Sequence, residues 1–263
     1  MNALHLALPC SIAAGSLMAV TWLISCRKDN AGWVDVAWSY SFSLMAGLAA
    51  ALGAAPLPRK FLLLAMILAW SLRLGTYLAL RVGRHAGEDP RYAALRTQFP
   101  NRPWTMFFFF FQAQAFLATL LAAPFFVAFA NPAPALSPLE IAGALLWITA
   151  FCGESLSDAQ LAAFRADPEN RGKVCDRGLW KYSRHPNYFF EWTIWCSFGV
   201  FALGSPHGWV GIFPPISMYF LLTKVTGIPP AEAQSLKSRG DAYREYQKRT
   251  SPFFPLPPRG AST

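Results

Sequence analysis

The chain is divided into long apolar runs, and no other feature restricts its fold as strongly. A transmembrane helix needs about 20 mostly apolar residues to cross roughly 30 Å of hydrocarbon. No run alternates as a strand would, and the runs are too long for the strands of a membrane barrel. The sequence therefore predicts an all-α polytopic membrane protein, a single membrane domain over 1–263. About seven transmembrane helices are expected, at 4–25, 33–54, 61–80, 105–130, 136–163, 188–204 and 208–226.

The composition agrees with a surface that faces lipid. Hydrophobic residues make up 54% of the chain and charged residues 14%, whereas soluble domains carry about 25% charged residues. The first run has no charge before Arg27. It is longer than the apolar centre of a signal peptide, so we expect a retained span.

The formal net charge of +9 follows membrane topology rather than a nucleic-acid patch. Five Arg or Lys residues lie in 81–102, six in 165–184 and seven from 224 onward, whereas 131–139 and 204–208 have none. Basic loops stay in the cytoplasm, so the amino terminus is expected outside and the carboxy terminus inside. Arg59 and Lys60 are the exception. The five cysteines form no Cys-x-x-Cys pair, so neither a disulfide framework nor a metal site is expected.

Ionisable residues in or near spans are costly and mark candidate sites. Glu154, Asp158 and Arg165 fall within about 40° on one helical face at 100° per residue. A helix end dipping into the cytosol would give the same pattern.

The segment 178–192, which reads GLWKYSRHPNYFFEW, favours a site. It combines a turn, a basic cluster and Pro186 at a plausible first helical position. The positive end of that helix would face the basic loop and suit a phosphate-bearing ligand. Asn187 and Glu191 are one turn apart and share a face. A lone His185 would more often be structural, but here it belongs to this dense motif.

On the third span, Trp70, Arg73, Tyr77 and Arg81 share one face. Aromatic anchoring at the membrane interface is the alternative for the two aromatic residues. Arg73 lies inside the span and needs a partner, for which Asp35 is available. The charged segment 88–92 is either a cap over a site or a solvated turn.

The segment 154–195 resembles the carboxy-terminal half of the steroid 5α-reductase family in its bacterial branch. Gly178-Leu179-Trp180 and the run from Asn187 to Glu191 carry the resemblance, and the tail around 241–255 resembles the family's ending. It implies a cofactor-binding half over about 140–255, a bacterial inner membrane and a cofactor site facing the cytoplasm. The cofactor implied is NADPH, and the positions implied to surround it are Glu154, Asp158, Arg165, Lys173, Tyr182, Arg184, His185, Asn187, Tyr188 and Glu191.

The implied reaction is hydride transfer to the β-carbon of an α,β-unsaturated ketone in a steroid-like or other lipophilic substrate from the bilayer. The resemblance aligns Trp70 with the family's catalytic tyrosine and Asp35 loosely with its glutamate, while Glu154 stands where it has asparagine. Trp70 cannot donate a phenolic proton. Asp35, Tyr77 and Arg73 are therefore the candidate catalytic residues, with Tyr40 or a water as other proton donors. Arg165, Lys173, Arg177 and Arg184 are expected to meet the cofactor's phosphates.

Two alternatives remain. The isoprenylcysteine methyltransferase type shares an Arg-His-Pro turn and a basic tail, and it would bind S-adenosylmethionine. Asp158, Asn187 and Glu191 together favour the reductase. A non-catalytic sterol-binding scaffold is the other alternative, and Trp70 keeps it open.

Overall fold

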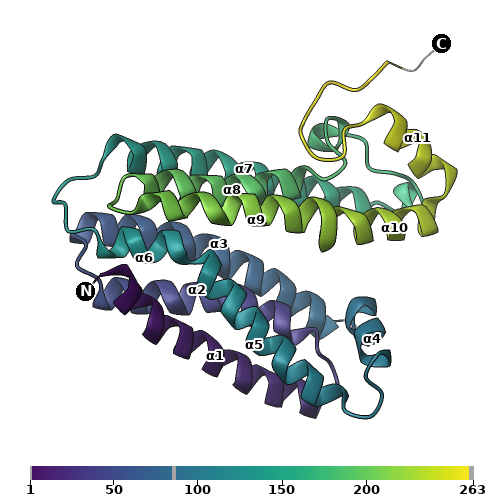
Figure 1. The fold of residues 1–263 in the computed structure, drawn as a ribbon. Coiled ribbons are helices and arrows are strands. Elements are labelled where there is room, and N and C mark those ends of the chain that lie inside the picture. Colours follow the sequence, from purple (N-terminus) through teal and green to yellow (C-terminus); the bar gives the residue numbers. More distant parts are fainter. Residues whose placement is uncertain (1, 85–86, 261–263) are drawn as a thin grey trace. The chain divides into compact units, whose positions relative to one another are not determined.

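The computed structural model describes residues 2–84 and 87–260 of the chain. All secondary-structure elements in the described part of the chain are helices, so the all-α prediction is confirmed (Figure 1). The α-helices are α1 Ala3–Lys28, α2 Trp33–Leu52, α3 Leu57–Arg84, α4 Pro90–Thr97, α5 Pro103–Leu121, α6 Ala123–Ala130, α7 Pro138–Ala166, α8 Pro186–Leu203, α9 Phe213–Phe220, α10 Ile228–Arg239 and α11 Asp241–Arg249. Shorter turns are η1 Pro168–Asn170, η2 Gly178–Lys181, η3 Gly208–Ile212 and the π-helical η4 Leu221–Val225.

Four of the described helices, α1, α3, α5 and α7, are both long and apolar enough to cross a membrane. The expectation of a polytopic membrane protein is met at this level, and the count of seven spans stays a prediction. The run expected at 105–130 is two helices, α5 and α6, which meet at Ala122. Pro124 lies in the first turn of α6, where its missing N–H costs least.

The chain forms two compact units. Unit 1 comprises the described residues of Met1–Ile141 together with Phe201–Gly211, and unit 2 those of Ala142–Val200 and Ile212–Thr263. Unit 2 covers most of the half predicted to bind cofactor. The single-domain prediction remains untested by this division.

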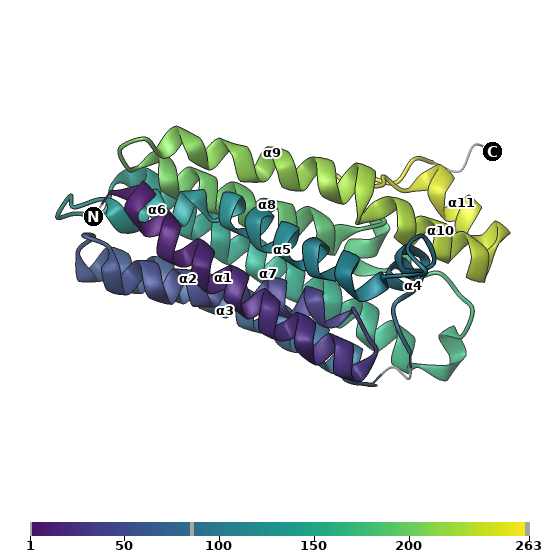
Figure 2. The same ribbon diagram turned by 60° about the horizontal axis from the view of Figure 1, so that its bottom comes forward.

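Unit 1 is a helical bundle in which α1 packs against α2 and α5, and α2 packs against α3 (Figure 2). Aromatic side chains fill its centre. The ring of Phe42 lies 5.3 Å from Trp70 and 6.3 Å from Phe125, and all three are fully buried. Trp70 is therefore a core residue of this bundle.

Arg59, at the start of α3, is a buried charge with complete compensation. Its Nε donates to Glu140 at 2.5 Å and an Nη donates to the same carboxylate at 3.2 Å. The remaining N–H groups donate to the carbonyl oxygens of Asn131, Ala133 and Ala135. Both members of the ion pair are at most 2% exposed. These contacts tie the loop before α7 to α3.

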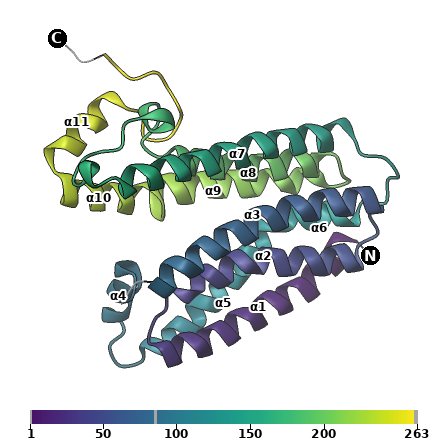
Figure 3. The same ribbon diagram turned by 180° about the vertical axis from the view of Figure 1, so that it is seen from behind.

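Unit 2 places α7, α8 and α9 side by side, followed by α10 and α11 (Figure 3). A Cβ at Gly153 on α7 would lie only 2.4 Å from the ring of Phe190 on α8. The missing side chain lets the two helices approach closely. The helix α11 is amphipathic, with Tyr243 and Tyr246 buried on one face.

Candidate active site

The first candidate site lies in unit 1, where the end of α3, the start of α2 and the helix α4 meet. Asp29 adopts a left-handed conformation that ends α1. Asn30 Oδ1 then accepts a hydrogen bond from Gly32 N at 2.8 Å, which forms a turn into α2. Asp89 caps α4 by accepting from Arg91 N at 3.0 Å, and Pro90 occupies the first helical position.

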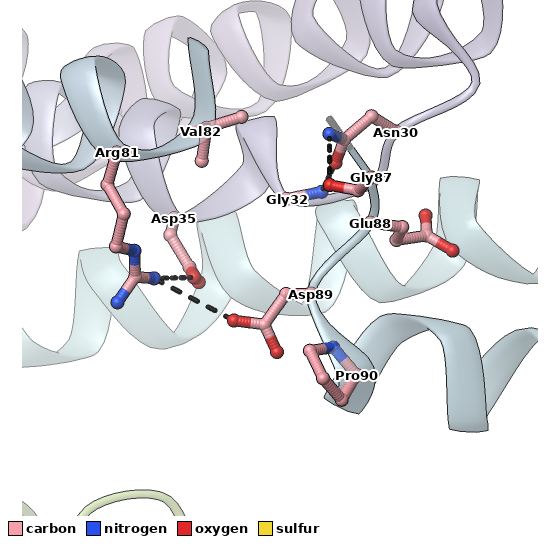
Figure 4. Close-up of a pocket in the computed structure, with 9 residues that line it drawn as sticks. All are labelled: Asn30, Gly32, Asp35, Arg81, Val82, Gly87, Glu88, Asp89 and Pro90. Atoms are coloured by element: carbon pink, nitrogen blue, oxygen red, sulfur yellow. Dashed lines mark hydrogen bonds and ion pairs between the residues drawn. The ribbon is translucent and has the colours of Figure 1, made fainter. Parts of the chain in front are cut away.

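Asp35 is the centre of this site. The phenol of Tyr92 donates to its Oδ1 at 2.6 Å, and Arg91 donates to its Oδ2 at 3.0 Å. Arg81 lies 3.8 Å from the carboxylates of both Asp35 and Asp89 (Figure 4). The charged segment 88–92 is thus a cap over Asp35 rather than a solvated turn.

A pocket of about 200 Å³ opens beside these charges. Figure 4 shows Asp35, Arg81 and Asp89 grouped at one side of it and the turn at Asn30 and Gly32 at the other. Its lining residues are Asn30, Gly32, Asp35, Arg81, Val82, Gly87, Glu88, Asp89 and Pro90. The guanidinium of Arg96 donates two hydrogen bonds to the carboxylate of Glu88 and one to Asp29. These bonds connect the segment before α4 to the end of α1.

Burial and neighbouring charges together set the protonation of Tyr92 and Asp89. Burial raises the pKa of the Tyr92 phenol well above its usual range, and the neighbouring Asp35 raises it further. Burial alone would raise the pKa of Asp89, but hydrogen bonds from the side chain and backbone of Arg91 outweigh it and lower that pKa. Tyr92 therefore keeps its proton and acts as a donor toward Asp35.

The other residues predicted as catalytic are placed differently. Tyr77 is 57% exposed and does not line the pocket, nor does the partly buried Arg73. Tyr40 hydrogen-bonds Thr76 at 3.1 Å.

The phenol that donates to Asp35 is Tyr92, which sequence reasoning missed. The Asp89-Pro90 pair signals a helix start and could have placed Tyr92 on a helix, but only tertiary contact brings it to Asp35.

The second candidate site lies in unit 2, where α7 faces the start of α8. Pro186 opens α8 as predicted. Asn187 Nδ2 donates to Asp158 Oδ1 at 3.3 Å. The Oδ1 atom of Asn187 is buried and accepts no hydrogen bond from the described residues. One turn later, the carboxylate of the buried Glu191 accepts from Trp195 Nε1 at 3.0 Å. Glu154, on α7, is also buried.

The Arg-His-Pro turn is bound to the carboxy-terminal helices. Arg184 donates to Glu232 on α10 at 2.6 Å and to the carbonyl oxygens of Thr250 and Gln247. His185 Nε2 lies 3.4 Å from the same carboxylate, and its ring stacks on Tyr188 at 5.3 Å. Burial alone would raise the pKa of Glu232, but hydrogen bonds from His185 and Arg184 outweigh it and lower the pKa to about 2.

Other basic residues of this half face outward. Arg165, Lys173 and Arg177 are exposed, and among the described residues none of the three has an ion-pair partner. Arg177 also lines a hollow of about 340 Å³ together with Gln160, Ala163, Phe164, Asp167, Asn170, Cys175 and Gly178. Tyr182 is 42% exposed. Among the predicted cofactor residues, three groups differ in burial. The buried ones are Glu154, Arg184, His185 and Glu191, the half-buried ones are Asp158, Asn187 and Tyr188, and the exposed ones are Arg165, Lys173 and Tyr182.

Comparison with known proteins gives the family. Residues 21–250 match the family described as "Protein of unknown function (DUF1295)". The chain belongs to this family. The matched range includes both candidate sites, since it contains Asp35 in unit 1 and Asp158, Asn187 and Glu191 in unit 2. A similar protein, "Uncharacterized protein C594.04c" of Schizosaccharomyces pombe, is 28% identical over 271 residues, covering 90% of this chain and 76% of that protein. No solved structure matches.

Proposed function

We propose that this DUF1295 protein is a membrane-embedded, NADPH-dependent reductase of a carbon–carbon double bond conjugated to a ketone. The proposed substrate is steroid-like or another lipophilic molecule that enters from the bilayer. The observation that carries the proposal is the group formed by Asp158, Asn187 and Glu191. This group supports a cofactor with an amide N–H that can donate to the buried Oδ1 atom of Asn187.

The residues in unit 2 fit a nicotinamide cofactor. A buried acceptor without a donor costs about 1–3 kcal/mol, and Asn187 Oδ1 is such an acceptor. The carboxamide of a nicotinamide supplies the N–H donor that would satisfy it. Asp158 fixes the Asn187 amide from the other side through the 3.3 Å hydrogen bond. Glu191 is held in place by Trp195.

The exposed cations complement the rest of such a cofactor. NADPH carries several phosphate charges, and Arg165, Lys173 and Arg177 offer side chains that no carboxylate of the described chain neutralises. Arginine binds phosphate with two parallel hydrogen bonds. When bound, the cofactor would supply a hydride to the β-carbon of the substrate.

Unit 1 holds an acid–base pair of its own, formed by Asp35 and Tyr92. Asp35 and Tyr92 share a 2.6 Å hydrogen bond with the proton on the Tyr92 oxygen. Arg91 and Arg81 hold the Asp35 carboxylate in position while it accepts from Tyr92.

We also propose seven spans, with the amino terminus outside and the cofactor residues on the cytoplasmic side of a bacterial inner membrane. The spans are α1, α2, α3, α5 with α6, α7, α8, and α9 with its flanking turns. In this topology, Arg59 and Lys60 are the basic residues that lie on the outer side of the membrane, against the positive-inside rule. Because Glu140 neutralises Arg59 within the core, only Lys60 remains to oppose the positive-inside rule.

The test is a binding titration of the full chain in detergent. NADPH, NADH and S-adenosylmethionine are added in turn to the parent, to Asn187→Ala and Arg165→Ala, and to Arg244→Ala as a matched exposed control on α11. The proposal expects NADPH binding that weakens by about tenfold or more in Asn187→Ala and Arg165→Ala but not in Arg244→Ala. Binding of S-adenosylmethionine instead would assign a methyltransferase. Binding of none of the three would end the reductase proposal.

A further inference from the structure

The helix α9 carries an apolar stripe that no described residue covers. Phe213, Ile216 and Phe220 are 47%, 64% and 58% exposed. They follow each other at spacings of three and four residues, so they lie on one face of the helix. Isolated apolar side chains at a surface are ordinary, but a continuous stripe marks a contact with lipid or protein.

The tail after α11 extends this stripe. Phe253 is buried against Tyr219 with ring centres 5.4 Å apart. The ring of Phe254 lies 6.2 Å from Tyr219 and 5.9 Å from Trp192. Phe254 itself is 42% exposed and Leu256 is 54% exposed. The apolar surface of α9 therefore continues onto a segment with no helical structure.

Hydrogen bonds fix the backbone of the segment that carries Phe254 and Leu256, so the exposure of these two side chains follows from the fold. Ser183 Oγ donates to the carbonyl of Phe253 at 2.8 Å, and Arg184 N donates to Ser251 O at 2.8 Å. Leu256 N donates to Tyr182 O at 3.0 Å. The segment 182–184 thus holds the backbone from which Phe254 and Leu256 extend outward.

Proline makes this segment compatible with a water-poor environment. Irregular backbone is costly near lipid because its N–H groups lack partners. Proline has no N–H group, and the tail contains Pro252, Pro255, Pro257 and Pro258. The amide of Leu256 is satisfied by Tyr182. Few donors are left to be desolvated.

We propose that Pro252–Leu256 is an interfacial anchor whose Phe254 and Leu256 side chains insert into the lipid bilayer. The continuity with the α9 stripe favours lipid over a protein partner. Arg259 follows the segment in the chain, and Lys181 precedes Tyr182, which accepts from Leu256 N. Both cations are exposed, and each lysine or arginine near an anionic membrane surface adds about 1 kcal/mol of attraction. The anchor holds α10 and α11 against the membrane independently of the reaction that the protein catalyses.

The first test leaves the sequence unchanged. The full chain is placed in vesicles of phosphatidylglycerol and phosphatidylethanolamine that contain a lipid with a photoreactive group near the glycerol end of its acyl chain. After illumination, trypsin releases the peptide 250–259, and the peptide 225–237, mostly from α10, serves as the control. The anchor predicts lipid adducts several-fold more abundant on 250–259. Equal labelling, or crosslinks from 250–259 to another protein chain, would overturn it.

The second test measures depth directly. Nitroxide labels are attached at Phe254→Cys, Leu256→Cys and, as a water-facing control on α11, Lys248→Cys, in a chain whose native cysteines are serine. The anchor predicts a ratio of oxygen to nickel-complex accessibility at 254 and 256 several-fold above that at 248. Ratios equal to the control at both positions would refute insertion. Unchanged thermal midpoints confirm that the labelled chains are folded.

Discussion

The two ends of α3 carry arginines with opposite surroundings. Arg59 donates five hydrogen bonds to Glu140 and three carbonyl oxygens and is 2% exposed. Arg81, 22 positions later in the same helix, is 38% exposed and approaches Asp35 and Asp89 only to 3.8 Å, beside a pocket. The guanidinium has five N–H donors, so Arg59 has none left for a ligand.

The same contrast recurs inside unit 2. Arg184 is buried and bound to Glu232 and two carbonyl oxygens, whereas Arg165 and Arg177 are exposed. Saturated, buried arginines hold chain segments together, and arginines at open surfaces remain available to ligands. By this criterion Arg59 and Arg184 are structural, while Arg165 and Arg177 are the ones to test for binding. Binding of cofactor by Arg184 and His185 stays a prediction.

The largest expected effect is on stability at Arg59. Arg59→Ala leaves Glu140 as an unpaired buried charge, so we expect a loss of about 3–5 kcal/mol in unfolding free energy. Lys60→Ala, one residue away and less buried, is expected to change stability by at most about 0.5 kcal/mol. Thermal or denaturant unfolding in detergent measures both. Equal shifts for the two variants would contradict a special role for the buried pair.

The next effect concerns catalysis at the open end of α3. Asp35→Asn removes the negative charge of the group that accepts the Tyr92 hydrogen bond, and we expect turnover of an enone to fall by about 10²–10⁴-fold. Binding of NADPH should be unchanged, because the predicted cofactor residues lie in unit 2. Asp29→Asn, an exposed carboxylate that also pairs with an arginine, is the matched control. Full activity of Asp35→Asn would remove Asp35 from the mechanism.

A smaller effect, with a defined pH dependence, is expected at Glu232. The folded pKa of about 2 lies below the ordinary value of 4.5, so its ionisation stabilises the folded state above pH 4.5. That contribution is lost as the pH falls from 4.5 through 2. Glu232→Gln should cost about 1.5–3 kcal/mol at neutral pH, and the difference from the parent should shrink across this window. Glu245→Gln, in an exposed pair, should show little difference at any pH.

The smallest effect is expected at Tyr77. Its side chain is 57% exposed, and the phenol that donates to Asp35 is Tyr92. Tyr77→Phe should therefore change stability by at most about 0.5 kcal/mol and leave turnover unchanged. Steady-state rates beside Tyr92→Phe decide between the two phenols. A large loss in Tyr77→Phe with normal activity in Tyr92→Phe would return the proton donor to the residue that the sequence favoured.

Patterns of a few residues predicted several local features of this fold. The apolar runs gave helices at the expected places, because a long apolar helix needs no partner segment to satisfy its backbone. Pro186 as the start of α8 and the shared face of Asn187 and Glu191 follow from local helical geometry. The contact of Asn187 with Asp158, 29 positions away on α7, is tertiary. The break at Ala122, within one expected span, was missed since neither Ala122 nor Pro124 alone decides between a kink and two helices.

By itself, the sequence determined that the chain is helical, apolar and basic in its loops, and that Asn187 and Glu191 lie one turn apart on one helical face. Periodicity and charge are local properties, so they can be read along the chain. Only the tertiary structure decided that Arg59 is neutralised by Glu140, 81 positions away, and that Tyr92 donates to Asp35, 57 positions away. Partners so distant in sequence are selected by packing and by the cost of leaving a buried charge or hydrogen-bonding group unpaired, and no local pattern records that choice.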